Sequence, residues 1–497
     1  MKSAVGWQSR FEFVRIKRAE LCSDVRPSER TQTDVWPFCV RGSVQLRTFL
    51  FGLFAPKSWP LFSARVTPGE PMRQWIAIGA AVGLVAVTLP MLRKHDVELA
   101  GLLSKGKLEP AAGGAAVTRE VTPPPLTDID LTRIDDRGNV ATAPAHGNRK
   151  AELTLAPKYQ RAAIALLRAG HVPEGAIVMT DVKTGRVLAW ASYVDQGAMH
   201  DVASEATAPT ASVFKIVTAT ALVEHAGLGP NTKQCYSGGE HAITAKDMVD
   251  NKKRDKWCAT LAQAMGRSLN TVFARLAAKN LDRDELGTTA NKLGWGTDIP
   301  FDVKIAPSTV AFPEDDLGFA RTAAGFWNTT MSPFQGANLA TTVANGGEMI
   351  RLSIVSSVKD DEGELYRGAT VRQSLKRVMS ESTANQVKSM MEETVDSGTS
   401  FKSFHDRAGR SYLPDIRIAG KTGTLTKPTS EGPFYTWWVG FAPSDKPEIA
   451  LSILVANGAK WRVKATHLAS DMLRVYFADK NMPGVRSPFD PGSTARR

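Results

Sequence analysis

A serine and a lysine three residues apart could form a nucleophile and its base. Ser212 and Lys215 stand at the start of an apolar run that continues to Val223. This run, with Pro209 just upstream, predicts a helix that begins near Ser212 and is buried on most sides. Positions i and i+3 share one face of a helix, so the two side chains should point the same way. A serine hydroxyl needs a neighbouring base, and a lysine in a desolvated site has a lowered pKa and can be that base.

The spacing of this pair is not specific by itself. It recurs in polar stretches at Ser104 and Lys107 and at Ser356 and Lys359, where a helix cap beside a solvated lysine explains it. The chemical interpretation of Ser212 therefore depends on motifs later in the chain.

Two further short motifs come after the serine in order. Ser268-Leu269-Asn270 lies within an apolar-periodic helical stretch, and Lys421-Thr422-Gly423-Thr424 comes after a strand predicted at 416–420. Each motif is weak alone, and a second Lys-Thr-Gly at Lys183–Gly185 falls in a predicted hairpin turn. Together, the ordered set is the one used by serine acyl transferases of the penicillin-binding and β-lactamase group.

From about Glu152 to Phe477 the sequence resembles the transpeptidase domain of penicillin-binding proteins. One departure is Ala211, because the family usually has glycine just before the nucleophile. Beyond the three motifs, the segments that carry the resemblance are Gly175–Ser192, Thr330–Ala337, Ala344–Gly347, Ser397–Thr399 and Trp437–Pro443.

The resemblance implies roles for five catalytic residues. Ser212 would be the acylated nucleophile and Lys215 its general base. Ser268 and Lys421 would relay the proton onward to the leaving amine. Asn270 would hold the substrate amide and orient Lys215.

It also implies a substrate-binding strand made by Thr422, Gly423 and Thr424. The two threonines would bind the substrate carboxylate, with positive charge added by Lys421. The oxyanion would lie between the backbone N–H groups of Ser212 and Thr424, donors aimed where charge develops. Neither a metal ion nor a cofactor is implied.

The implied substrates are D-alanyl-D-alanine stem peptides of peptidoglycan, and β-lactam antibiotics would acylate the same serine. We expect a monofunctional D,D-transpeptidase, since the segment before residue 150 is too short for a glycosyltransferase domain and lacks its acidic motif. Alternatives are a D,D-carboxypeptidase, a non-catalytic β-lactam sensor or cell-wall scaffold, and a serine β-lactamase. The last is disfavoured because no Glu-x-x-Leu-Asn-like segment lies between the second and third motifs.

The N-terminal part suggests a membrane anchor. The uncharged run Trp75–Leu92, bracketed by Arg73 and by Arg93-Lys94, predicts one uncleaved transmembrane helix. Residues 1–71 lack periodicity, so we expect them to be disordered, or Met72 to be the true start. The resulting prediction is a single-pass inner-membrane protein with its catalytic domain in the periplasm or otherwise outside the cell. A membrane-bound polymerase of glycan strands is the expected partner.

The charge distribution bears on the kind of partner, and the cysteines bear on the cellular compartment. The net charge of +12 is spread without a basic block after the first residues, which argues against a nucleic-acid partner. Cys235 and Cys258 lie in one loop-rich stretch and could form a disulfide in an oxidising compartment or remain free thiols.

The order of predicted elements indicates an α+β fold. Its five-stranded antiparallel sheet would be assembled from both ends of the domain, covered by helices on both faces, and joined to a helical subdomain. Residues 93–150 should be an Ala/Gly/Pro-rich linker, 151–480 the transpeptidase domain and 481–497 a disordered tail. The predicted helices cover 158–167, 212–225, 261–280, 286–293 and 463–477, and the predicted strands 176–180, 187–191, 416–419, 436–441 and 449–455.

Overall fold

The structure is a computed structural model that describes residues 125–239, 242–426, 433–458 and 461–491. The predicted anchor at 75–92 and the predictions for 1–71 and Met72 lie outside these residues. Among the helices that are described, none combines the length and apolar character needed to cross a bilayer.

A five-stranded antiparallel sheet forms the centre, as predicted. Its strands in spatial order are β11 (Ala419–Thr426), β12 (Phe434–Ala442), β13 (Ile449–Asn457), β3 (Glu174–Asp181) and β4 (Val187–Val194). The inner strands are apolar along nearly their whole length because helices cover both of their faces. The strand predicted at 416–419 begins three residues later and runs through the Lys-Thr-Gly-Thr motif, so the motif lies within β11 rather than after it.

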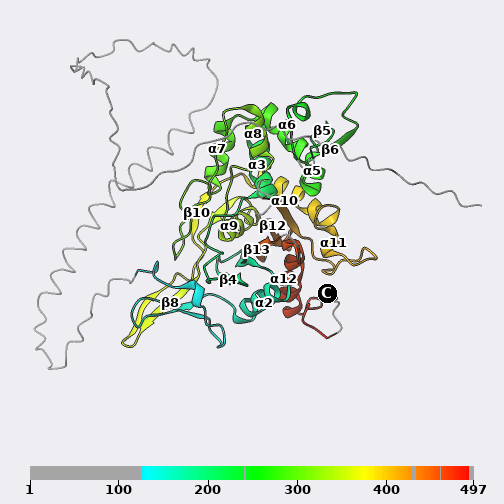
Figure 1. Cartoon of the computed structure of the whole chain (residues 1–497). Helices are drawn as coiled ribbons and strands as arrows, with labels where there is room; N and C mark the ends of the chain where they lie inside the picture. Colours follow the sequence, from blue (N-terminus) through cyan, green and yellow to red (C-terminus); the bar gives the residue numbers. More distant parts are fainter. Residues whose placement is uncertain (1–124, 240–241, 427–432, 459–460, 492–497) are drawn as a thin grey trace, which may run out of the picture. The chain divides into compact units, whose positions relative to one another are not determined.

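Helices cover both faces of the sheet (Figure 1). On one face, α9 (Pro333–Ala344) is buried along almost its whole length against β13, β3 and β12. On the other face, α2 (Pro157–Ala169) and α12 (Ala465–Asp479) pack together, and both were predicted as helices from their apolar spacing.

A helical region lies beyond one end of the sheet (Figure 1). The helix predicted over 261–280 is broken in two, because Ser268 adopts a left-handed conformation with φ of 57° and Leu269 is extended. The elements of this region and its surroundings are η2 (Ala211–Phe214), α3 (Lys215–Ala226), β5 (Lys233–Tyr236), α4 (Ala245–Met248), β6 (Trp257–Thr260), α5 (Leu261–Arg267), α6 (Asn270–Asn280), α7 (Arg283–Lys292), α8 (Asp316–Ala323), α10 (Glu381–Asp396) and α11 (Phe401–Phe404).

A second sheet corrects the predicted linker. Within 125–150 the chain forms η1 (Leu131–Arg133) and β1 (Thr142–Pro144), and β1 pairs with β2 (Lys150–Leu153). The strand β2 then pairs with β8 (Val355–Asp360), which pairs with β9 (Gly363–Arg367). The linker prediction was wrong here because β1 is only three residues long and pairs with β2, whose other partner, β8, lies more than 200 residues later in the chain. A separate pair, β7 (Glu348–Ile350) and β10 (Ser374–Arg377), completes the strands.

The predicted disordered tail is also wrong for its first part. Residues 481–491 form turns, and the carbonyl of Arg486 accepts a 3.0 Å hydrogen bond from Nε of Arg474 on α12. Residues 492–497 lie outside the described part.

The close approach of α9 to the sheet depends on Gly336. A Cβ added there would overlap Ser452 Oγ and lie 3.0 Å from Ser452 Cβ and 3.1 Å from Val439 Cγ2. We therefore expect Gly336→Ala to lower the free energy of unfolding by about 1–3 kcal/mol, since the packed sheet must shift. The control is Gly287→Ala on α7, where the nearest atom would be Phe312 Cε2 at 3.6 Å.

Because alanine is the better helix former, the control should stabilise the domain by about 1 kcal/mol. Denaturant unfolding of both variants measures the difference. Equal effects of the two substitutions would contradict close packing at Gly336.

Candidate active site

Ser212 lies in η2, directly before α3, and is partly exposed. The residue before it, Ala211, has φ of 53°, a conformation that favours glycine and that costs alanine about 1–2 kcal/mol. Gly325 allows the chain after α8 to approach this turn, since an added Cβ would overlap the Ala211 carbonyl and lie 3.0 Å from Ser212 Cα.

Lys215 is the first residue of α3 and its side chain is completely buried. Its Nζ lies 2.7 Å from Ser212 Oγ, 2.8 Å from Asn270 Oδ1 and 2.5 Å from the Ala324 carbonyl oxygen. Burial, and next the charge of nearby Lys421, lower the pKa of Lys215 well below its ordinary value. The amine contacts the serine oxygen and is buried away from water. It therefore has the geometry and the lowered pKa that a general base requires.

The break between α5 and α6 presents the second motif to this lysine. The left-handed Ser268 ends α5, and Asn270 begins α6 two residues later. As a result, Asn270 points to Lys215 while Ser268 points to Lys421. If 261–280 formed one continuous helix, the turn at Ser268 and Leu269 would be absent. That turn directs Ser268 to Lys421 and Asn270 to Lys215.

Lys421 is the second buried lysine. Its Nζ donates to Ser268 Oγ at 3.0 Å and to the Thr422 carbonyl oxygen at 2.7 Å. Burial lowers its pKa to about 7. At neutral pH this side chain can therefore both give and take a proton.

The third motif flanks Ser212 along the edge strand β11. A Cβ added to Gly423 would lie 3.2 Å from both Ala211 Cβ and Val213 Cγ2, so the glycine lets the strand lie against η2. Thr422 Oγ1 lies 2.6 Å from Thr399 Oγ1, and Thr424 is exposed further along the strand. The structure thus brings the three motifs together, with the lysines underneath and the hydroxyls at the surface.

Two contacts in the site were not predicted. The Ala324 carbonyl is a backbone acceptor for Lys215, and no residue type signals such a role. Thr399 lies in a segment that carried the family resemblance, but its contact with Thr422 joins residues far apart in sequence. Among the described residues, no cluster of three or more His, Cys, Asp or Glu side chains is arranged to bind a metal ion.

Cys235 and Cys258 form a disulfide between β5 and β6. The sequence left open whether these cysteines are bonded or free. This disulfide-linked pair of strands lies next to α6, the helix that starts at Asn270.

Comparison with known proteins agrees with the geometry. Residues 175–473 match the family model described as the penicillin binding protein transpeptidase domain. The peptidoglycan D,D-transpeptidase PbpA of Mycobacterium tuberculosis is 26% identical over 358 residues, which cover 65% of this chain and 70% of PbpA.

Two solved structures share the fold. The crystal structure of PBPA from M. tuberculosis has a TM-score of 0.56 and 24% identity, and the match covers 67% of this chain and 82% of that one. The penicillin G acyl-enzyme complex of M. tuberculosis penicillin-binding protein A has a TM-score of 0.52 and 25% identity, with 68% and 82% covered. Since the family model spans more than half of its length and the three motifs converge on one site, the chain belongs to the penicillin-binding protein transpeptidase domain family.

Proposed function

We propose that this protein is a peptidoglycan D,D-transpeptidase that forms an acyl-enzyme at Ser212 with D-alanyl-D-alanine stem peptides. The observation that carries the proposal is the contact of a completely buried Lys215 amine with Ser212 Oγ and Asn270 Oδ1. The naming of PbpA as a peptidoglycan D,D-transpeptidase supports this reaction class. The acyl-enzyme complexes of M. tuberculosis penicillin-binding protein A support covalent capture of β-lactams.

Acylation uses the two lysines in sequence. Ser212 Oγ attacks the carbonyl carbon of the penultimate D-alanine while neutral Lys215 accepts the hydroxyl proton. The backbone N–H groups of Ser212 and Thr424 stabilise the oxyanion. The C–N bond then breaks, and the proton that Lys215 took from Ser212 passes along Ser268 and Lys421 to the leaving D-alanine amine, so that Lys215 is neutral again.

The edge strand β11 offers a place for the donor peptide. It pairs only with β12 within the five-stranded sheet, so its other edge can add an extended peptide by main-chain hydrogen bonds. Thr422 and Thr424 present hydroxyls to the substrate carboxylate, and the protonated form of Lys421 supplies the charge. Asn270 then both orients Lys215 and receives the substrate amide.

The acyl-enzyme is resolved by an amine of a neighbouring stem peptide. That amine attacks the ester carbonyl and loses its proton to Lys215. The ester C–O bond then breaks, Lys215 returns the proton to Ser212 Oγ, and the cross-link is formed. Water in place of the amine would give a carboxypeptidase.

We place this chemistry outside the cytoplasm, on a protein anchored in the inner membrane by residues 75–92. The Cys235–Cys258 disulfide supports an oxidising compartment, because such bonds are rare in the cytosol. A membrane-bound glycan-strand polymerase would supply the substrate strands.

Labelling with a fluorescent penicillin tests the proposal. We expect the wild-type protein to gain a covalent label that persists for many minutes, because no carboxylate of the described residues contacts Lys215 or Ser212 to activate water for rapid deacylation. Ser212→Ala should gain no label while keeping the wild-type melting temperature, since it removes only the nucleophile. Equal labelling of Ser212→Ala would refute the assignment of Ser212, and loss of the wild-type label within seconds would point to a β-lactamase.

The pKa values of the two lysines predict a bell-shaped pH dependence of acylation. At low pH Lys215 gains a proton and can no longer act as a base, so the rate falls. Above about pH 7 in the free enzyme Lys421 loses its charge, so binding of a carboxylate-bearing penicillin weakens.

Stopped-flow acylation from pH 5 to 10 measures both limbs. Lys421→Arg keeps a positive charge over this range, so the alkaline limb should disappear although the rate falls at every pH. An alkaline limb that persists unchanged in Lys421→Arg would contradict the role assigned to Lys421.

A further inference from the structure

We propose that Arg275 is a positioning residue, which holds the Asn270 end of α6 in place by fastening this helix to the disulfide-closed segment 233–260. The inference rests on the proposed function, because it concerns how Asn270 is held against the general base Lys215. Arg275 is not part of any of the three motifs and does not touch the reacting groups.

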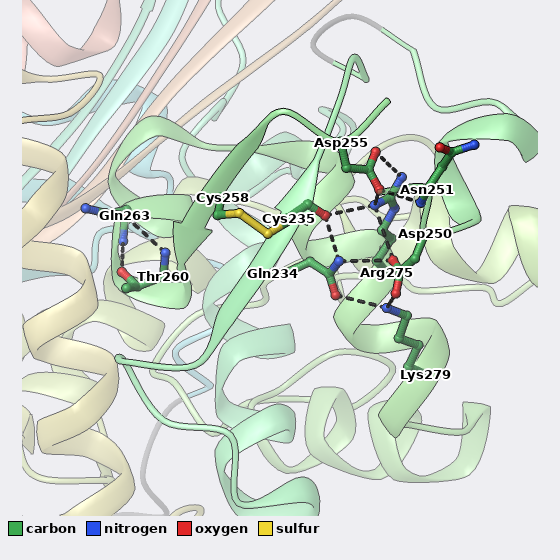
Figure 2. The surroundings of a disulfide bond; sticks show 10 residues. All are labelled: Gln234, Cys235, Asp250, Asn251, Asp255, Cys258, Thr260, Gln263, Arg275 and Lys279. Atoms are coloured by element: carbon green, nitrogen blue, oxygen red, sulfur yellow. Dashed lines mark hydrogen bonds and ion pairs between the residues drawn. A yellow bond between two sulfur atoms is a disulfide. The ribbon is translucent and has the colours of Figure 1, made fainter. Parts of the chain in front are cut away.

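Arg275 is completely buried, and its guanidinium reaches three parts of this segment (Figure 2). It forms a two-pronged ion pair with Asp255, at 2.7 Å and 3.2 Å. It also donates to three backbone carbonyls, those of Asp247 at 2.5 Å, Cys235 at 2.8 Å and Val249 at 3.1 Å. One side chain of α6 therefore ties together β5, the end of α4 and the chain before β6.

A second layer of contacts surrounds this group (Figure 2). Lys279, one turn further along α6, binds Asp250 at 2.6 Å and Gln234 Oε1 at 3.0 Å. Ser237 Oγ donates to Asp255 at 3.0 Å. Closer to the site, Thr271 Oγ1 donates to the Gly238 carbonyl at 2.9 Å. The segment is thus bonded to α6 from its first turn to its last.

The disulfide connects the same segment to the other half of the second motif. Cys235 and Cys258 are opposite each other in the β5–β6 ladder, and β6 runs directly into α5, which ends at Ser268. Asn270 is therefore held through Arg275 and α6, while Ser268 is held through β6 and α5. Both side chains take their position from the segment 233–260.

The planar guanidinium suits this role better than a lysine would. It presents five N–H donors in a fixed fork, and here all three nitrogens have acceptors. An ammonium could keep the charge of the pair with Asp255 but could not reach the three carbonyls at once. A small shift of α6 would lengthen the 2.8 Å contact of Asn270 with Lys215, and misplacement by about 1 Å can cost 10²-fold in rate.

The test separates position from stability. Arg275→Lys is compared with Arg474→Lys, which changes a mostly buried arginine of α12 on the far face of the sheet. For each, stopped-flow labelling with penicillin gives the affinity of the non-covalent complex and the acylation rate constant separately, beside the melting temperature. We expect the rate constant of Arg275→Lys to fall roughly 10- to 100-fold with little change in affinity. That of Arg474→Lys should stay at the wild-type value even where its melting temperature falls equally.

A second measurement covers the case in which Arg275→Lys does not fold. Cys258 is exposed, so an added dithiol can reduce the disulfide of the wild-type protein, giving two cysteine thiols and the oxidised dithiol. The reduced, folded protein should acylate more slowly and recover on reoxidation. A wild-type rate in folded Arg275→Lys, or equal slowing by Arg474→Lys, would overturn the inference alone. If Arg275→Lys does not fold, a wild-type rate in the reduced protein would overturn it. A wild-type protein that never acylates would instead refute the proposed function.

Discussion

The site depends on a lysine amine buried without a carboxylate partner. Among the described residues, Lys215 Nζ forms hydrogen bonds with the hydroxyl of Ser212, the amide oxygen of Asn270 and a backbone carbonyl, and it lies 5.7 Å from the centre of the Phe273 ring. An ammonium ion in such a place loses its hydration without gaining an opposite charge, so the neutral amine is favoured. That one constraint lowers the pKa of the Lys215 amine, and a lower pKa is what the proposed role as base for Ser212 needs. The charge of Lys421, which is held by a hydrogen bond to Ser268, lowers the pKa of Lys215 further.

The fold meets this requirement by bringing four distant segments to one point. The turn before α3 supplies Ser212 and Lys215, the break after α5 supplies Ser268 and Asn270, the end of α8 supplies a carbonyl, and β11 supplies Lys421. Left-handed residues make the tight turns possible, since both Ala211 and Ser268 have positive φ. Strained backbone next to a reacting group is stable only when surrounding contacts hold it. Strands β11 and β12 pack against η2, which contains Ala211, and α10 packs against α5, which ends at Ser268.

Much of this arrangement could be predicted from the sequence. The spacing of Ser212 and Lys215 predicted a shared helix face, and alternation of apolar runs with turns predicted the β3–β4 hairpin and the late strands. The break at Ser268 could not be predicted, because apolar spacing continues across it and serine has no strong preference for a left-handed conformation. Residues 125–150 were predicted to be a linker because β1 is only three residues long and joins its sheet through β2, which pairs with β8 far along the chain. Contacts such as that of Lys215 with the Ala324 carbonyl cannot be predicted from residue types, because every residue has a backbone carbonyl.

The most direct test is the protonation state of Lys215 in the free enzyme. Heteronuclear NMR of protein carrying ¹³C-labelled lysine, with the Lys215 signal assigned from Lys215→Arg, follows its titration from pH 5 to 11. The account predicts a pKa for Lys215 well below that of the exposed lysines, so that the amine is neutral when the enzyme acylates. A Lys215 signal that titrates together with the exposed lysines near 10.4 would contradict it, since a lysine still protonated at neutral pH cannot take the proton of Ser212.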